Sequence, residues 1–302
     1  FETKVWNITR FVGQQLDEDR NPLSEPAYRD ADRWILSKCS RVAREVRENM
    51  EEYRFDAALR TLREFVWHDL ADDYLELVKG RLYEGRPGER DAARQALFTT
   101  VSASLRMLSP FAPFLAEEAY RGLPGTEGSV HAADWPAPDM VDPEHEAAGD
   151  LIAEIASTIR GWKSDAGLAL NAPLDRVEVY PDVDLDVPVD TYDLSEAASA
   201  PVQIREGVPS VELVPVEIEP DHSVIGPEFR DQAGQVVAAL GAMDPERVAE
   251  QKTLDGEIEV DLDGEVALIP GDAVEIVEEH RAESGEEVVV LDSDSATILV
   301  YE

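Results

Sequence analysis

Several residue types are scarce in this chain, and each scarcity excludes a class of protein. The 302 residues include a single cysteine, Cys39, so no disulfide can form within the chain, which is typical of a protein from a reducing cytoplasm. Only five of the 27 basic residues are lysine. No apolar run approaches the ~20 residues that a membrane span needs, so we expect no membrane partner.

The net charge of −38 arises from 65 acidic residues. Few lysines beside a large acidic excess are typical of halophilic archaea, which keep molar salt inside the cell. In such salt the Debye length is about 3 Å, so repulsion across an acidic surface is largely screened. We therefore interpret the acidity as adaptation to salt and not as a sign of a cationic partner.

The charges are unevenly placed along the chain. Residues 1–110 carry 18 Lys and Arg against 20 Asp and Glu, whereas residues 111–302 carry nine against 45. A polyanionic partner would require cations in the first third, because each neutralised phosphate releases counterions and adds affinity. A helical bundle with many surface ion pairs would mix the two signs equally well. Charge alone leaves both interpretations open.

Apolar residues recur at helical spacing through the first part of the chain. The expected helices cover residues 4–16, 30–53, 55–82, 89–108 and 114–120. Short connections between them predict an all-α bundle over residues 1–122. The chain is thus expected to be multi-domain, with this bundle preceding a small α+β region.

Residues 123–144 are rich in proline, glycine and aspartate and are expected to form a linker that wraps the bundle. The acidic region 145–302 opens with a helix over 144–164, and a division near residue 220 is left open. Its remaining elements are short. We expect strands at 175–180, 202–204, 211–218, 258–262, 265–269, 287–291 and 296–301, and helices at 228–240 and 245–252.

No motif in the chain predicts a catalytic centre. It contains neither a glycine-rich phosphate loop nor a nucleophile elbow. Glu64 and His68 lie four residues apart on a predicted helix, but a zinc site needs a third ligand, so we expect no metal. By itself the chain is expected to be a binding module.

The segment from Lys4 to Val12 suggests what it binds. Lys4 and Phe11 are seven residues apart, hence two turns along one helix face, and Arg10 borders them. A cation, a guanidinium and a ring on one surface suit an unstacked RNA loop, whose bases stack on aromatic planes. The alternative makes Trp6 and Phe11 ordinary core residues.

Five segments resemble the class I aminoacyl-tRNA synthetases for valine, isoleucine and leucine. They are residues 4–12, 64–83 (EFVWHDLADDYLELVKGRLY), 109–118 (SPFAPFLAEE), 128–136 and 159–174. The second, third and fourth are closer to the valine enzymes than to their relatives, and the fifth resembles the archaeal branch. Beyond about residue 200 the match is weaker, although 224–229 (VIGPEF) resembles the C-terminal extensions of archaeal valine and isoleucine enzymes.

The resemblance implies the anticodon-binding domain and C-terminal extension of an archaeal, halophilic-type valine–tRNA ligase. Such an enzyme activates valine with ATP and Mg²⁺, esterifies valine tRNA, and hydrolyses misloaded threonine. Those activities belong to upstream domains of the family, so this chain is expected to be non-catalytic and without a cofactor. The expected partner is valine tRNA and not DNA, and the expected state is a cytoplasmic monomer.

The resemblance also implies roles for individual residues. Lys4 and Phe11 fall where the family contacts the anticodon loop, Phe11 as the stacking partner, and Arg10 is their neighbour. Arg160 and Lys163 are expected to contact the tRNA body nearer its elbow. The strand-rich acidic end departs from the coiled-coil arm of bacterial members, and its few cations predict only light contact with RNA.

Two alternatives remain open at this point. The first is the same region of an isoleucine–tRNA ligase, which tRNA preference would reveal. The second is a non-catalytic helical scaffold or protein-interaction module, whose basic bundle face would pair with acidic neighbours and would bind no RNA.

Overall fold

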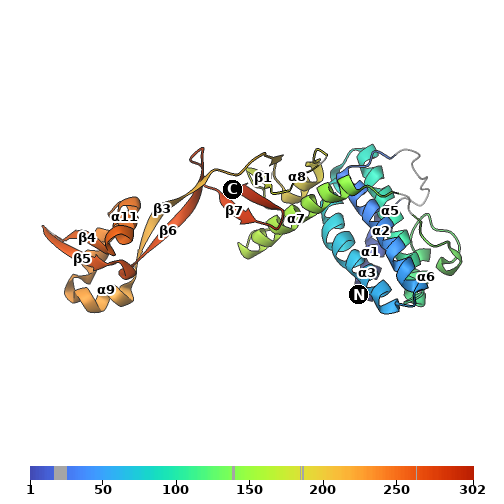
Figure 1. Ribbon diagram of the computed structural model, residues 1–302, viewed down its shortest axis with the longest axis horizontal. Coiled ribbons are helices and arrows are strands. Elements are labelled where there is room, and N and C mark those ends of the chain that lie inside the picture. The colour runs from blue at the N-terminus through green and yellow to red at the C-terminus, as the bar shows by residue number, and fades with distance from the viewer. Residues whose placement is uncertain (17–25, 138–139, 184, 186, 263) are drawn as a thin grey trace. The chain divides into compact units, whose positions relative to one another are not determined.

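The computed structural model describes residues 1–16, 26–137, 140–183, 185, 187–262 and 264–302 (Figure 1). Contacts divide the chain into two compact units. Unit 1 comprises residues 1–207, 291–300 and 302, and unit 2 comprises residues 208–290 and 301. A helical first part followed by a region of short strands confirms the predicted fold class. The boundaries predicted at 122 and 144 stay predictions.

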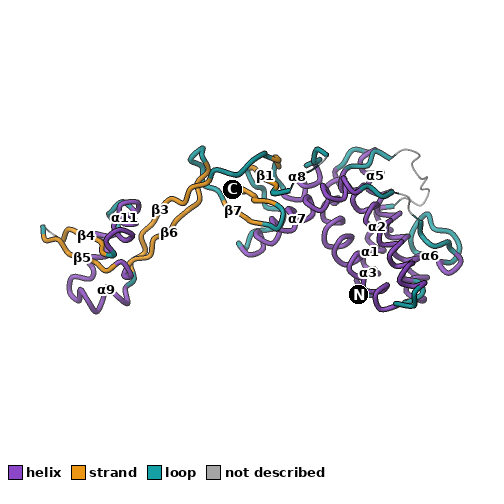
Figure 2. The backbone as a smooth tube through the Cα atoms, viewed as in Figure 1, coloured by secondary structure: helices purple, strands orange, loops and turns teal. Residues whose placement is uncertain are grey.

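Unit 1 begins with a helical bundle, drawn in purple in Figure 2. Its helices are α1 (Glu2–Gln15), α2 (Asp30–Glu51), α3 (Phe55–Glu64), α4 (Leu75–Glu84), α5 (Pro87–Leu108), α6 (Pro113–Arg121) and α7 (Pro143–Asp165). Prolines open α5, α6 and α7, at the position where a missing N–H costs nothing. Among the described helices, none is long and apolar enough to cross a membrane.

Helix α2 is the central helix of the bundle and packs against α3, α5 and α7. Its apolar stripe is buried, and Trp34 and Cys39 are almost completely enclosed. The predicted wrapping linker follows α6 through a short 3₁₀ turn, η2 (Val130–Ala132). Trp135 in this linker donates a hydrogen bond from Nε1 to the carbonyl of Ala43 (3.1 Å). Residues 138 and 139 of the linker lie outside the described residues.

The helix predicted over 55–82 contains a feature that its spacing does not reveal. Between α3 and α4 the chain forms a π-helix, η1 (Phe65–Tyr74). Its wider turn still buries Phe65, Leu70 and Tyr74, so the apolar pattern alone resembles that of an α-helix. π-Helical turns are rare and are often found at functional sites.

A four-stranded sheet completes unit 1. Its strands are β1 (Arg176–Pro181), β2 (Val202–Ile204), β7 (Val289–Asp292) and β8 (Ala296–Tyr301), in the order β2-β1-β8-β7. β1 and β2 run parallel, with Val177 opposite Val202. The crossover between them contains helix α8 (Tyr192–Ala198), which the sequence analysis did not predict.

Unit 2 has a core of its own. Strands β3 (Val211–Pro220) and β6 (Val274–Ala282) form one antiparallel ladder, and β4 (Glu257–Leu262) and β5 (Glu265–Pro270) form a second. Three helices, α9 (His222–Phe229), α10 (Ala233–Leu240) and α11 (Pro245–Asp255), belong to the same unit. Ile225, Val236, Leu240 and Val248 from these helices enclose the buried side of the β4–β5 hairpin.

Two predictions for unit 2 are wrong. Strand β6 was not foreseen, because Glu275, Glu278 and Glu279 interrupt its apolar alternation on a half-exposed ladder. The single helix expected over 228–240 is instead divided between α9 and α10, with a 3₁₀ turn over Arg230–Gln232. Arg230 adopts a positive φ of 45°, which a continuous helix cannot contain.

Gly149 allows the closest approach between α7 and α2. A methyl group at Gly149 would lie 2.3 Å from Cβ of the buried Trp34, whereas nothing lies within 4 Å of the corresponding position at Gly161 on the same helix. We expect Gly149→Ala to lower the free energy of unfolding by about 1–3 kcal/mol through overpacking. Gly161→Ala should raise it by about 0.5–1 kcal/mol through helix propensity.

Thermal unfolding of the Gly149→Ala and Gly161→Ala variants in molar KCl, monitored by circular dichroism, tests these two predictions. Equal effects of the two substitutions would contradict the packing of α7 on Trp34.

Candidate nucleic-acid interface

Helix α1 buries one face and exposes the other. Val5, Ile8, Thr9 and Val12 are buried against the bundle. Phe11 is half-buried at the border of this face, and Arg10 is exposed. Among the described residues no ion pair is found for Arg10. The structure therefore leaves a guanidinium and part of a ring accessible on neighbouring positions of α1.

Lys4 is held by contacts with the π-helix η1. Its Nζ lies 2.6 Å from Oδ1 of Asp72 and 4.3 Å from the centre of the Trp67 ring. The side chain of Lys4 is 25% exposed to solvent. The cation is thus fixed in direction but still reaches the surface.

Trp6 contradicts the alternative in which the aromatic residues of α1 form ordinary core. Trp6 is 37% exposed, and it lies outside the set of buried positions on α1, four residues before the exposed Arg10. An exposed tryptophan near Arg10 extends the accessible apolar surface of α1.

The π-helix carries three carboxylates, and each is paired with a different cation. Lys38 binds Asp69 (2.8 Å), Lys4 binds Asp72, and Arg160 lies 3.5 Å from Asp73. Burial raises the pKa of Asp73 to about 6, although Arg160 opposes the shift. A share of the cations in the first third of the chain therefore neutralises the bundle itself. The ion-pair interpretation of the charge pattern is correct for these residues.

The two residues expected to contact the tRNA body are engaged inside unit 1. Arg160 is 19% exposed and donates from Nη2 to the carbonyl of Asp72 (2.8 Å). Lys163 is completely buried. Its Nζ donates to the carbonyls of Leu170 (3.3 Å), Ala172 (2.7 Å) and Ala198 (2.8 Å). Burial lowers the pKa of this ammonium group.

The expectation for Lys163 is therefore corrected: its ammonium group cannot meet a phosphate in this structure. It joins the end of α7 to the turn before β1 and to the end of α8 by three hydrogen bonds. The sequence reveals a charge at this position but not the ring of carbonyls that encloses it.

No metal centre is found among the described residues. His68 is mostly exposed, and its Nδ1 lies 3.5 Å from Oδ2 of Asp72, which Lys4 already binds. Glu64 and His68 share a helix face, but among the described residues they form no group of three metal-ligating side chains.

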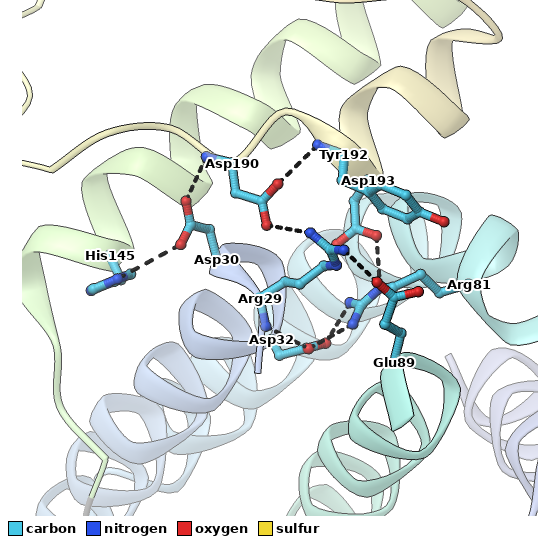
Figure 3. Close-up of polar contacts among 9 residues, drawn as sticks. All are labelled: Arg29, Asp30, Asp32, Arg81, Glu89, His145, Asp190, Tyr192 and Asp193. Carbon is cyan, nitrogen blue, oxygen red and sulfur yellow. Dashed lines mark hydrogen bonds and ion pairs between the residues drawn. The ribbon is translucent and has the colours of Figure 1, made fainter. Parts of the chain in front are cut away.

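The strongest electrostatic feature is a buried network that joins the bundle to the first turn of α8 (Figure 3). Arg81 donates from both Nη atoms to Asp32 (2.8 and 2.7 Å) and from Nε to Asp193 (2.7 Å). The phenol of Tyr74 donates to Asp32 (2.7 Å). Arg81 and Asp32 are completely buried, and Asp193 is 3% exposed.

A second arginine closes the outer side of this network (Figure 3). Arg29 binds Glu89 (2.6 Å) and Asp190 (2.8 Å), and its guanidinium carbon lies 4.1 Å from the centre of the Tyr192 ring. The backbone N–H of Asp190 donates to Asp30 (2.8 Å). Asp190 is thus fixed to Arg29 and Asp30 at the start of α2, and Asp193 is fixed to Arg81 of α4.

One guanidinium serves two carboxylates, so the buried group Arg81–Asp32–Asp193 has an excess negative charge. Burial raises the pKa of Asp193 to about 7, and Asp32 adds to the shift while Arg81 opposes it. Near neutral pH a proton therefore binds in the folded state and not in the unfolded state.

Comparison with known proteins identifies the bundle. Residues 32–179 match the family described as the anticodon-binding domain of tRNA ligase. The matched segment extends from Asp32 in α2, through α7, to Val179 in β1. This part of the chain is therefore similar to the anticodon-binding domain of tRNA ligases.

The chain is similar along its whole length to valine–tRNA ligases of archaea. The enzyme of the halophile Natronomonas pharaonis is 60% identical over 302 residues, which is 100% of this chain and 34% of that protein. The enzymes of Methanosarcina barkeri (40% over 306 residues) and Archaeoglobus fulgidus (39% over 304) each align with 99% of this chain. The chain spans about a third of the length of these relatives and matches their C-terminal part, which confirms the predicted resemblance.

The network predicts a pH dependence. Because the folded-state pKa of Asp193 lies above its unfolded value, the stability that this group contributes is complete below about pH 4 and is lost as pH rises to about 7. Relative to Asp193→Asn, the wild-type free energy of unfolding should fall by about 1 kcal/mol per pH unit in this window.

Denaturant unfolding of the two proteins at pH 5, 6, 7 and 8 in molar KCl measures the difference. A constant difference across the series would show that Asp193 is ionised throughout and that the predicted proton is absent.

Lys163 yields a prediction about stability. We expect Lys163→Met to lower the free energy of unfolding by about 3 kcal/mol, because three carbonyls lose their donor and the hydrogen bond to that of Ala198 is buried. Lys79→Met is the matched control, since Lys79 is an exposed lysine whose ion pair in the described part of the chain is with Glu76, and it should cost less than about 0.5 kcal/mol. Thermal melts of both variants test the assignment, which fails if the two substitutions have the same effect.

Proposed function

We propose that this chain is the tRNA-recognition part of a valine–tRNA ligase and that its bundle binds the anticodon loop of valine tRNA. Phe11 stacks on an unpaired base, Lys4 meets a phosphate, and Arg10 supplies a second cation beside them. The whole ligase activates valine with ATP and Mg²⁺, esterifies the tRNA, and acts as a monomer in the cytoplasm. Other parts of the ligase perform the chemistry, and this chain holds no cofactor.

The observation that carries the proposal is the similarity of the entire chain to valine–tRNA ligases, at 60% identity in the relative from Natronomonas pharaonis. The geometry of α1 supports it. A half-buried ring beside an exposed guanidinium gives a base both a hydrophobic surface to stack on and a charge for its phosphate.

Salt concentration decides which contacts carry the affinity. Phosphate contacts weaken as salt rises, because the entropy gained from counterion release falls. Stacking of a base on an aromatic ring contributes about 1–3 kcal/mol and is not ionic. In molar salt, therefore, Phe11 should matter more than Lys4 or Arg10.

Binding of this chain to valine tRNA and isoleucine tRNA transcripts in molar KCl tests the proposal. We expect valine tRNA to bind more tightly, and Phe11→Ala to weaken that binding about 5- to 150-fold, the equivalent of ~1–3 kcal/mol. Phe114→Ala is the control, because Phe114 is 90% exposed on α6 and is not one of the proposed contact residues, so it should change affinity less than twofold.

Equal affinity for both tRNAs would contradict the valine assignment. Unchanged binding by Phe11→Ala would contradict the stacking role of α1. A preference for isoleucine tRNA would favour the isoleucine ligase instead.

A further inference from the structure

The outward face of α3 continues into the π-helix η1 and forms a hollow there. Arg60, Arg63, Glu64, Trp67 and His68 line it, at spacings of three and four residues that place them on one side of the helix. The hollow has a volume of about 390 Å³, within the range of small-ligand sites. None of these side chains is used by the α1 face described above, except that Trp67 contacts Lys4.

Trp67 is a fixed aromatic surface in this hollow. Its ring is half-buried, with Nζ of Lys4 at 4.3 Å from the ring centre and the guanidinium carbon of Arg63 at 5.9 Å. Lys4 is itself tied to Asp72 (2.6 Å). The ring is therefore held by a cation from α1, so little conformational freedom is lost when a ligand stacks on it.

Both arginines of the hollow can bind an anion. Arg60 is 66% exposed, and its one ion pair in the described structure is an exposed contact with Asp56 at 3.2 Å. Such pairs contribute little and exchange readily. Arg63 is exposed and makes no ion pair with a described residue. The two guanidinium groups are three residues apart and can meet neighbouring oxygens of one phosphodiester.

We propose that this hollow binds one unstacked nucleotide of a single-stranded RNA segment, with the base on the ring of Trp67 and its phosphate on Arg60 and Arg63. The proposal rests on the proposed tRNA-binding function and adds a site to it. Lys4 is part of the α1 face and also contacts Trp67. An RNA strand that leaves Phe11 can therefore continue into the hollow. An acidic peptide would use the arginines but gain nothing from the tryptophan ring.

The first test compares two arginine positions. Arg47 forms an exposed pair with Glu51 four residues away, as Arg60 does with Asp56, but lies outside the hollow. In binding of valine tRNA, the Arg60→Ala/Arg63→Ala double variant should weaken affinity at least tenfold in 0.2 M KCl. It should also reduce the slope of log affinity against log salt by about 0.7–1.4, or one to two phosphate contacts. Arg47→Ala should stay within twofold of the wild type.

The second test concerns the ring and uses a single-stranded RNA hexanucleotide as the probe. RNA should quench tryptophan fluorescence in the wild type, and Trp67→Leu should lose that quenching and bind at least fivefold more weakly. Trp67→Phe keeps a ring and should retain most of the affinity. Circular dichroism checks that Trp67→Leu is folded; if it is not, the surface arginine variants still decide the matter.

The outcomes separate this proposal from the function it rests on. If Phe11→Ala weakens tRNA binding but the double variant behaves like Arg47→Ala, the hollow is not an RNA site and the anticodon proposal stands. If the chain does not prefer valine tRNA but the hexanucleotide quenches Trp67, the hollow stands and the anticodon proposal falls. Binding of neither RNA overturns both. Equal losses by Arg60→Ala/Arg63→Ala with acidic peptide and RNA, without any effect of Trp67→Leu, would overturn the nucleotide assignment.

Discussion

The guanidinium of Arg81 is the group on which the rest of unit 1 depends. It is completely buried and binds Asp32 of α2 and Asp193 of α8 from its position on α4. A buried ion pair is weak evidence of stability by itself, but removal of one member leaves an uncompensated charge that costs about 3–5 kcal/mol. In this arrangement of the three helices, Nε and both Nη atoms of Arg81 each donate to a carboxylate. The network therefore selects one packing of α8 on the bundle, and through α8 it positions the sheet.

Charge in the bundle serves two purposes that the sequence cannot separate. Lys38 and Arg160 neutralise carboxylates of the π-helix, so they are part of the scaffold. Arg10, Arg60 and Arg63 are exposed and reach solvent. The near-neutral total of the first 110 residues thus combines internal ion pairs with a set of accessible cations. Cations that reach the surface, Lys4 among them, are the ones that the proposed RNA contacts could use.

The helical part of the fold could be predicted because burial and helical spacing coincide there. The ends of α2 and α5 fall within a few residues of the predicted ends, since Pro87 and the start at Asp30 are local signals. The π-helix could not be predicted, because Phe65, Leu70 and Tyr74 fit an α-helical stripe almost equally well. Strand β6 could not be predicted either, because its exposed glutamates resemble those of an acidic loop. In the structure they lie on the β3–β6 ladder.

The candidate site shows the same limit. The spacing of Lys4 and Phe11 reveals a shared face, but not that Lys4 is tied to Trp67 and Asp72, which lie more than sixty residues further along the chain. Lys163 has the same charge as Lys4 in the sequence, and only the three carbonyls around it distinguish a structural lysine from an accessible one. The spacing of Arg60, Arg63 and Trp67 is readable in the sequence, but a hollow beside them is not.

The order in which the strands of unit 1 occur has a consequence for synthesis on the ribosome. The chain leaves unit 1 after Gly207, forms unit 2, and returns at Leu291 to supply β7 and β8. β8 lies next to β1 in the middle of the sheet, although it is made after the whole of the β3–β6 and β4–β5 ladders. The bundle and unit 2 can each fold as soon as their residues emerge, since each has a core of its own. The sheet has to wait, with β1 and β2 incompletely paired, until unit 2 has been translated.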